Sequence, residues 1–258
     1  MSQTLQAGAR GLDDAAPLVL AHTSLFLDLD GTLAPIMSHP GEVGPKAERN
    51  ALLRRLSESL GGRLAVVSGR SIADIDRILE GAVIAVAGVH GLERRDAKGG
   101  LHRIAPHPAL ARVAEELRQF AAALPGVLIE DKTLSLAVHF RAEPGAAHIV
   151  EAEALRIAAA NGLAVQPGDH VVELKTPGHD KGDALRAFMA DAPFAGARPI
   201  FVGDDLTDEA AFGAAASLGG FGVLVGRTRP SLARRQLSDP EAVLDWLRAA
   251  VMTAGAEA

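Results

Sequence analysis

The chain has 258 residues with no cysteine, and its 32 acidic and 26 basic residues give a formal net charge of −6. The lack of cysteine excludes disulfides, thiolate metal sites and cysteine nucleophiles, and the acidic balance argues against general nucleic-acid binding. No apolar run approaches the roughly 20 residues of a membrane span, and the first twenty residues lack the pattern of a secretory signal, so we expect a cytoplasmic protein without membrane or nucleic-acid partners.

The first third of the chain is predicted to alternate buried strands with helices. After residues 1–20, which lack periodicity and are predicted to be a partly ordered leader, an apolar run over 25–29 is typical of a buried parallel strand. A helix over 47–60 follows, with its apolar positions on one face. A second strand over 64–67, a further helix and a third strand over 83–87 continue the alternation. This order predicts right-handed crossovers and a doubly wound parallel sheet, which is a Rossmann-like α/β fold.

A different pattern, which starts with a polar hairpin near residues 96–100, predicts a second and smaller domain. Its elements are expected to be helices over about 108–124 and 146–160 and strands over 127–130, 134–140, 163–166 and 170–174. In the strand over 134–140, apolar and polar residues alternate, so that one face packs on a core and the other faces solvent or a cleft. The middle of the chain is therefore predicted to form an α-β-β-α-β-β unit.

The first pattern resumes with a helix at Lys181 and continues to the last helix of the chain. Its further strands and this last helix are expected over 199–203, 221–225 and about 241–250. We therefore predict a core domain of residues 21–94 and 176–258, into which a cap domain of residues 95–175 is inserted. Two domains also agree with a typical domain length of roughly 150 residues.

Residues 28–32 (DLDGT), which end the first predicted strand, are the first candidate site. The carboxylates of Asp28 and Asp30 project to the same side of an extended strand end, where they repel each other unless a cation or a shared proton relieves them. Gly31 allows the backbone to turn there. One carboxylate then suits a nucleophile and the other an acid/base, both near Mg²⁺. The alternative is an ordinary Asp-Gly turn.

A second acidic group follows the predicted strand over 199–203. Asp204, Asp205, Asp208 and Glu209 lie within six residues, which is unfavourable unless a metal compensates their charge. Ligation by oxygen alone favours Mg²⁺. The alternative is a solvated helix N-terminus, because acidic residues also suit the first helical turn.

Ser68 and Lys181 supply the hydrogen-bond donor and the positive charge that the carboxylates lack. Ser68 ends the second strand, where its hydroxyl can donate to a phosphoryl oxygen. Lys181 opens a helix for which Asp180 is a suitable N-cap, and its ammonium can neutralise both an aspartate nucleophile and an incoming phosphate. For each residue alone, the alternatives are a serine in a helical turn and a solvated lysine.

Four motifs of the chain occur in the order that is found in the haloacid dehalogenase superfamily, which the chain therefore resembles. They are residues 28–32, Ser68, Lys181 and residues 203–205. The predicted cap domain, between the second and third motifs, resembles the larger α/β cap of that superfamily. Further motifs narrow the resemblance to the trehalose-6-phosphate phosphatases: residues 67–70 (VSGR), 87–93 (AGVHGLE), 130–132 (EDK), 139–141 (HFR), 172–175 (VELK) and 203–209 (GDDLTDE).

The resemblance implies a role for each matching residue. Asp28 would attack the phosphoryl group, and Asp30 would protonate the leaving sugar oxygen and then activate water. Ser68 and Lys181 would bind phosphoryl oxygens. Mg²⁺ would be held by Asp28, the backbone carbonyl of Asp30, Asp204 and, as ligand or neighbour, Asp208. Substrate contacts would come from Ser68, Gly69, Arg70, His90, Glu130, Lys132 and Glu173; His90 is either substrate-facing or structural.

The function implied by this resemblance is Mg²⁺-dependent hydrolysis of trehalose 6-phosphate through an aspartyl phosphate, by a protein expected to be a monomer. The main alternative is a phosphatase of another sugar phosphate, such as sucrose 6-phosphate or a glycosyl-glycerate phosphate. A phosphomutase is a further alternative. A catalytically silent sugar-phosphate sensor is disfavoured, because Asp28, Asp30, Lys181 and Asp204 are all present.

Overall fold

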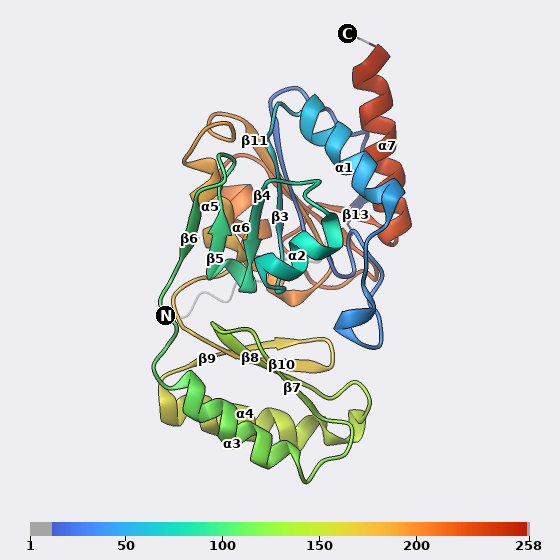
Figure 1. Cartoon of the computed structure of the whole chain (residues 1–258). Coiled ribbons are helices and arrows are strands. Elements are labelled where there is room, and N and C mark those ends of the chain that lie inside the picture. The colour runs from blue at the N-terminus through green and yellow to red at the C-terminus, as the bar shows by residue number, and fades with distance from the viewer. Residues whose placement is uncertain (1–11, 257–258) are drawn as a thin grey trace, which may run out of the picture.

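The computed structural model describes residues 12–256, and its larger part is built on one mostly parallel sheet, the main sheet (Figure 1). The strands of the main sheet within these residues are β1 (Asp13–Asp14), β2 (Thr23–Leu27), β3 (Leu64–Val67), β4 (Ala85–Gly88), β5 (Glu93–Arg95), β6 (Leu101–Arg103), β11 (Arg198–Gly203), β12 (Phe221–Val225) and β13 (Arg235–Leu237). Their order is β1-β13-β12-β11-β2-β3-β4-β5-β6. All neighbours from β1 to β4 pair parallel, whereas β5 and β6 pair antiparallel. The predicted doubly wound sheet is confirmed.

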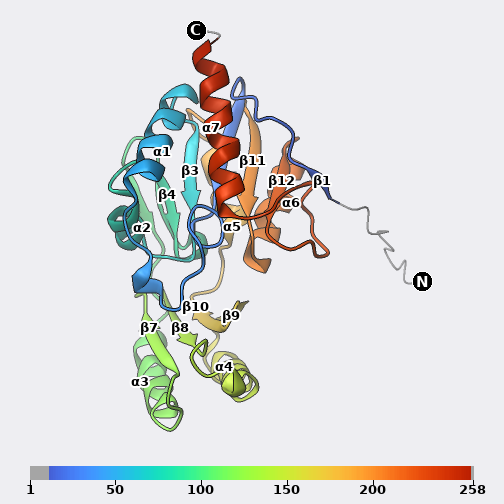
Figure 2. The same cartoon turned by 90° about the vertical axis from the view of Figure 1, so that its right-hand side faces the viewer.

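Helices cover both faces of the main sheet (Figure 2). Leu25 and Leu27 of β2 belong to a core that includes residues of α1 (Ala47–Ser59), α2 (Ile72–Leu79) and α7 (Pro240–Ala256). Phe26, between them, belongs to a second core with α5 (Lys181–Met189) and α6 (Glu209–Ser217). Successive side chains of a strand point to opposite faces, so a strand that is covered on both faces is apolar throughout. The lack of alternation over 25–29 has this cause.

The described chain also forms a separate four-stranded antiparallel sheet, called the cap sheet below. In order across the sheet, its strands are β7 (Leu128–Asp131), β8 (Ser135–His139), β10 (Val171–Lys175) and β9 (Ala164–Gly168). The helices α3 (Leu110–Ala121) and α4 (Ala147–Asn161) cover the face that points away from the main sheet (Figure 1). Leu136 and Val138 of β8 pack into the core under these helices, while His139 lines the cavity on the opposite side. The predicted α-β-β-α-β-β order and the alternation in β8 are confirmed.

The polar segment near residues 96–100 is a hairpin, as expected, but its strands belong to the main sheet. β5 pairs with β4, and β6 pairs with β5. The domain limit at residue 95 stays a prediction; the strands of the main sheet continue to Arg103 before the chain enters the helices and strands of the cap sheet.

The described part of the predicted leader lies against the main sheet and α7. β1 pairs with β13, Leu18 and Leu20 are buried, and the indole N–H of Trp246 donates to the carbonyl of Ala16 at 2.7 Å. Residues 1–11 of the leader lie outside the described residues. Within residues 12–256, no helix is both long enough and apolar enough to cross a membrane.

Candidate active site

A cavity of about 860 Å³ lies between the carboxyl ends of the parallel strands and the cap sheet, and residues of both line it. Asp28, Ser68 and Asp204 directly follow β2, β3 and β11, which are neighbours in the main sheet. Parallel strands have their carboxyl ends at the same edge of a sheet, so these three side chains reach the cavity together. The main-chain N–H of Asp28 donates to the carbonyl of Val202 at 2.9 Å, which ties the start of the turn to β11.

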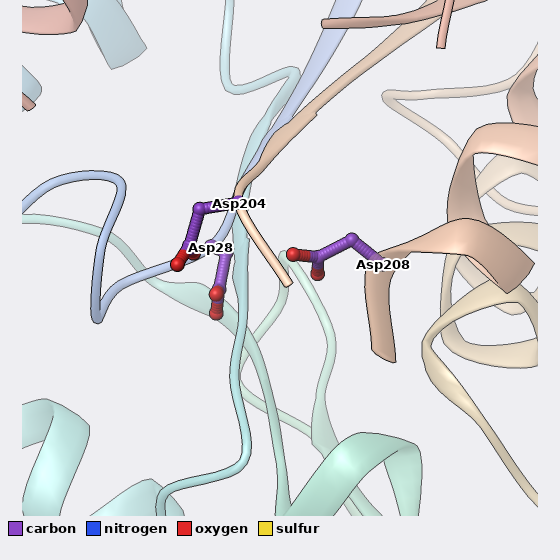
Figure 3. A group of neighbouring side chains, drawn as sticks. All are labelled: Asp28, Asp204 and Asp208. Atoms are coloured by element: carbon purple, nitrogen blue, oxygen red, sulfur yellow. The ribbon is translucent and has the colours of Figure 1, made fainter. Parts of the chain in front are cut away.

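Asp28, Asp204 and Asp208 form a compact group of carboxylates (Figure 3). One oxygen from each lies within 4.8 Å of those of the other two. Gly31, which has φ +76°, makes this approach possible, because a Cβ atom there would lie 2.0 Å from Oδ2 of Asp204. The hydroxyl of Thr32 donates to Oδ1 of Asp204 at 3.3 Å and holds that side chain in place.

The carboxylates of this group destabilise one another's charge. Burial raises the pKa of Asp28 well above its usual value, and the neighbouring acids Asp208, Asp204 and Asp30 add to this, while Lys181 opposes it. Burial and the charge of Asp208 raise the pKa of Asp204 to about 7. A bound divalent cation would offset the excess negative charge, and the donors are all oxygen atoms. The residues therefore fit a metal site of the kind that oxygen-preferring cations occupy.

Lys181 lies inside this acidic group as its buried counter-charge. Its Nζ atom is 2.7 Å from Oδ1 of Asp208 and 3.0 Å from Oδ1 of Asp28, and its side chain is only 2% exposed. Burial alone would lower the pKa of Lys181, but the two carboxylates outweigh it and hold the pKa above its usual value. The predicted N-cap Asp180 is confirmed, since its side chain accepts from the main-chain N–H of Asp183 and fixes the start of α5.

Asp30 points toward Arg70 rather than toward the three-carboxylate group. Nε and Nη2 of Arg70 lie 2.6 and 2.8 Å from the two carboxylate oxygens of Asp30. The main-chain N–H of Arg70 donates to the hydroxyl oxygen of Ser68 at 3.2 Å. Arg70 therefore holds both Asp30, the acid/base candidate, and Ser68, a candidate for phosphate binding.

Glu173 of the cap sheet connects the two halves of the cavity. Its Oε2 atom is 3.1 Å from Nε2 of His90, on the main-sheet side, and 3.3 Å from Nζ of Lys132, on the cap side. Lys132 also donates to the carbonyl of Gly69 at 3.1 Å. A side chain at Gly69 would collide with His90, whose ring lies 2.7 Å from the position of a Cβ atom. Glu130 pairs with His139 at 2.8 Å on the same face of the cap sheet.

The structure brings almost all predicted site residues to this one cavity. Those that line it are Asp28, Asp30, Ser68, Gly69, Arg70, His90, Glu130, Lys132, Glu173, Lys181 and Asp204. Asp208 does not line the cavity itself but accepts a hydrogen bond from Lys181, which does. Lys175, the last residue of the 172–175 motif, donates to the carbonyl of His179 and is not among the lining residues. The proximity is a finding, while the individual roles stay predictions.

The sequence motifs missed several residues that line or support the cavity. Ile36 and Met37 line it from the loop after residues 28–32, and Arg227 lines it from the loop after β12. The one sequence feature that could have indicated these three residues is their position shortly after the carboxyl end of a parallel strand, β2 or β12. Asp74, which holds Arg70, carries no such signal, because it lies within α2.

His90 is expected to make the stability of the protein depend on pH. Burial lowers the pKa of His90, and the attraction of Glu173 only partly opposes it. The folded pKa is therefore below the unfolded value of about 6.5, so His90 makes no unfavourable contribution above that pH and destabilises the fold as the pH falls below it. We expect His90→Asn to reduce the loss of stability between pH 7 and pH 5, measured by urea unfolding. Asparagine tolerates the positive φ of 55° at this position.

A matched control for this measurement is His148→Asn, because His148 is an exposed histidine of α4. We expect that variant to keep the pH dependence of the unmodified protein. An unchanged slope in the His90 variant would show that burial of His90 is not the cause.

Comparison with known proteins identifies relatives that match most of this chain. The family model described as "Trehalose-phosphatase" matches residues 26–241. The trehalose-6-phosphate phosphatase of Escherichia coli (strain K12) is 39% identical over 233 residues, which cover 90% of this chain and 87% of that protein. The probable trehalose-phosphate phosphatase of Sinorhizobium fredii is 40% identical and covers 82% of this chain and 81% of its own length.

Solved structures share the fold. The C-terminal domain of trehalose-6-phosphate phosphatase from C. albicans superposes with a TM-score of 0.82 at 21% identity, over 95% of this chain and 99% of that chain. A haloacid dehalogenase-like hydrolase from Bacteroides thetaiotaomicron superposes with a TM-score of 0.62 at 17% identity, over 87% of this chain and 97% of that chain. The predicted fold class is confirmed.

Proposed function

This chain belongs to the trehalose-phosphatase family, and we propose that it hydrolyses trehalose 6-phosphate to trehalose and phosphate with Asp28 as the nucleophile. It is a phosphoric monoester hydrolase. The observation that carries the assignment of Asp28 is its position: a buried carboxylate at the end of β2, 3.0 Å from Nζ of Lys181 and beside Asp204 and Asp208, on the floor of the cavity.

The first half of the proposed reaction transfers the phosphoryl group to the protein. An oxygen of Asp28 attacks phosphorus, and the bond from phosphorus to the sugar oxygen breaks with its electron pair on that oxygen. Asp30 gives its proton to the same oxygen, which leaves as the free hydroxyl. Lys181 and the hydroxyl of Ser68, which line the same cavity as Asp28, bind phosphoryl oxygens and offset their charge.

The second half releases phosphate. Water attacks phosphorus, Asp30 takes its proton, and the bond from phosphorus to the Asp28 oxygen breaks to restore the carboxylate. The cap sheet covers the cavity during these steps and limits access of other water molecules. We assign the sugar to the cap side, where Glu130, Lys132 and Glu173 offer charged partners for its hydroxyl groups.

We propose that the metal is Mg²⁺. The residues that would hold it are Asp28, Asp204 and the backbone carbonyl of Asp30, with Asp208 beside them. When bound, the cation polarises the phosphoryl group and offsets the charge of the carboxylates. The cytoplasmic location and the monomeric state stay predictions.

A panel of phosphate esters tests the proposed substrate and metal. We expect the release of phosphate from trehalose 6-phosphate to exceed that from sucrose 6-phosphate and from a glycosyl-glycerate phosphate on the order of 10-fold or more in kcat/KM. EDTA should stop the reaction and excess Mg²⁺ should restore it. Ca²⁺ serves as the control cation, because it is larger and prefers more ligands, so it should restore little activity.

Each result has a defined consequence. Equal rates for trehalose 6-phosphate and sucrose 6-phosphate would leave the alternative of a broader sugar phosphatase. Turnover that persists in EDTA would contradict the metal site.

A further inference from the structure

Arg70 has an environment that a substrate contact does not explain. Each of the three nitrogens of its guanidinium group faces a carboxylate oxygen: Nε and Nη2 face Asp30, at 2.6 and 2.8 Å, and Nη1 faces Asp74 at 2.5 Å. The side chain is only 9% exposed. Burial lowers the pKa of Arg70, but the two carboxylates outweigh this and raise it above its usual value. Three of its five N–H groups are thus engaged by carboxylates of this chain before any substrate binds.

The pair between Arg70 and Asp30 fixes a direction as well as a distance. Two parallel N–H···O bonds hold the plane of the carboxyl group, which a single contact from a lysine does not. Each carboxylate oxygen still has a second lone pair, so Asp30 remains able to carry or take a proton while Arg70 holds it. We propose that Arg70 is a positioning residue that orients Asp30 for both proton transfers; this inference rests on the role proposed above for Asp30.

Arg70 is itself held on several sides, as a positioning residue requires. Asp74 lies in the first turn of α2, where its main-chain N–H donates to the N-cap Ser71. The other oxygen of Asp74 accepts two bonds from Arg77, which lies outside the cavity lining. The main-chain N–H of Arg70 donates to Ser68. The guanidinium group therefore has little freedom to move, and neither has the carboxyl group that it holds.

The test uses two substrates that differ in their need for a proton donor. Trehalose 6-phosphate releases a sugar alkoxide, which needs protonation, whereas p-nitrophenyl phosphate releases a phenolate that does not. For Arg70→Lys and Arg70→Met we expect kcat on trehalose 6-phosphate to fall about 10²-fold, the lower end of the range for general acid–base catalysis, with little change in KM. On p-nitrophenyl phosphate, the first-turnover release of nitrophenolate should fall much less than the later turnovers, which need Asp30 to activate water.

A double-mutant cycle and a matched arginine complete the design. In the background of Asp30→Asn, Arg70→Lys should cause no further loss of kcat, because the group that it positions is gone. Arg95→Met removes another two-bond arginine–aspartate pair, with Asp76 of α2, that touches neither Asp30 nor Asp74, and we expect it to leave the ratio of the two substrates unchanged. Melting temperatures of all variants are measured alongside.

Three outcomes would overturn the proposal. A rise in KM for the sugar phosphate at constant kcat would make Arg70 a substrate contact. An equal fall in the rates with both substrates, in the first turnover as well as in later ones, together with a lower melting temperature, would make the role of Arg70 structural. If Arg70→Lys lowered kcat in the Asp30→Asn background by as much as it does in the unmodified protein, the two residues would act separately. Failure of the proposed function is distinguishable, because it would appear in the unmodified protein or in Asp30→Asn alone.

Discussion

Replacement of Asp28 by asparagine is expected to abolish turnover, with a fall in kcat on the order of 10⁴-fold or more, as for other covalent nucleophiles. The amide keeps the shape of the side chain but is not a nucleophile at phosphorus. The measurement is phosphate release from trehalose 6-phosphate, together with acid-quenched trapping of substrate-derived labelled phosphate on the protein. We expect the label on the unmodified protein and not on the variant.

The loss of activity is not expected to come from unfolding. Burial and the surrounding acids raise the pKa of Asp28, which means that the fold favours a neutral side chain at this position even with Lys181 beside it. The uncharged asparagine should therefore keep or raise the melting temperature at neutral pH. Labelled phosphate on Asp28→Asn, or a lower melting temperature, would contradict this account.

Asp205→Asn is the matched control for this variant. Asp205 is the next residue after Asp204, lines the same cavity and has a pKa raised by burial. It contributes no oxygen to the group of Asp28, Asp204 and Asp208. Asparagine can also replace its bond to the main-chain N–H of Leu206. We expect a far smaller loss of activity than for Asp28→Asn.

The sequence was sufficient where a local pattern decides the structure. The apolar run over 25–29 predicted a strand buried on both faces, and the alternation over 134–140 predicted a strand with one face on a core. Both predictions succeed because each buried position of a strand selects an apolar residue, so the sequence shows which faces are covered. The acidic motifs follow strands β2 and β11, and these strands are parallel neighbours. Their carboxyl ends therefore lie side by side, which brings the two motifs together.

Short polar strands were beyond the sequence patterns. β5 and β6 have three residues each and include Arg94, Arg95 and Arg103, so no apolar periodicity marks them as part of the main sheet. β1 has two residues, both acidic and exposed. Such strands form because an edge of a sheet already offers hydrogen-bond partners, which is a property of the assembled fold.

Side-chain partners were equally beyond local patterns. Arg70 and Asp30 are 40 residues apart, and His90 and Glu173 are 83 apart. The motifs placed each of them in the cavity but not in pairs, because pairing depends on the angle between elements and on the rotamers chosen there. Lys175 shows the converse: it belongs to the same short motif as Glu173 (residues 172–175), but its ammonium group donates to the carbonyl of His179 and it does not line the cavity.

Replacement of Lys181 by methionine is expected to have the largest effect on stability. The change leaves the buried carboxylates of Asp28 and Asp208 without their cation, which in similar cases costs about 3–5 kcal/mol. The raised pKa of Lys181 sets the pH window: its stabilisation is full below the unfolded value of about 10.4 and is lost only as the pH rises through the higher folded value. Urea unfolding at neutral pH in EDTA therefore measures the whole effect.

Mg²⁺ should stabilise the Lys181→Met variant more than the unmodified protein, because the cation and the ammonium group offset the same negative charge and each is worth more without the other. Lys175→Met is the matched control: Lys175 is also buried, but its Nζ atom donates to a carbonyl rather than to a pair of carboxylates, so its removal breaks no direct ion pair. We expect the control to lose less stability and to gain no extra response to Mg²⁺. An equal response in both variants would mean that the cation and Lys181 act on separate charges, and that the three carboxylates are not one electrostatic unit.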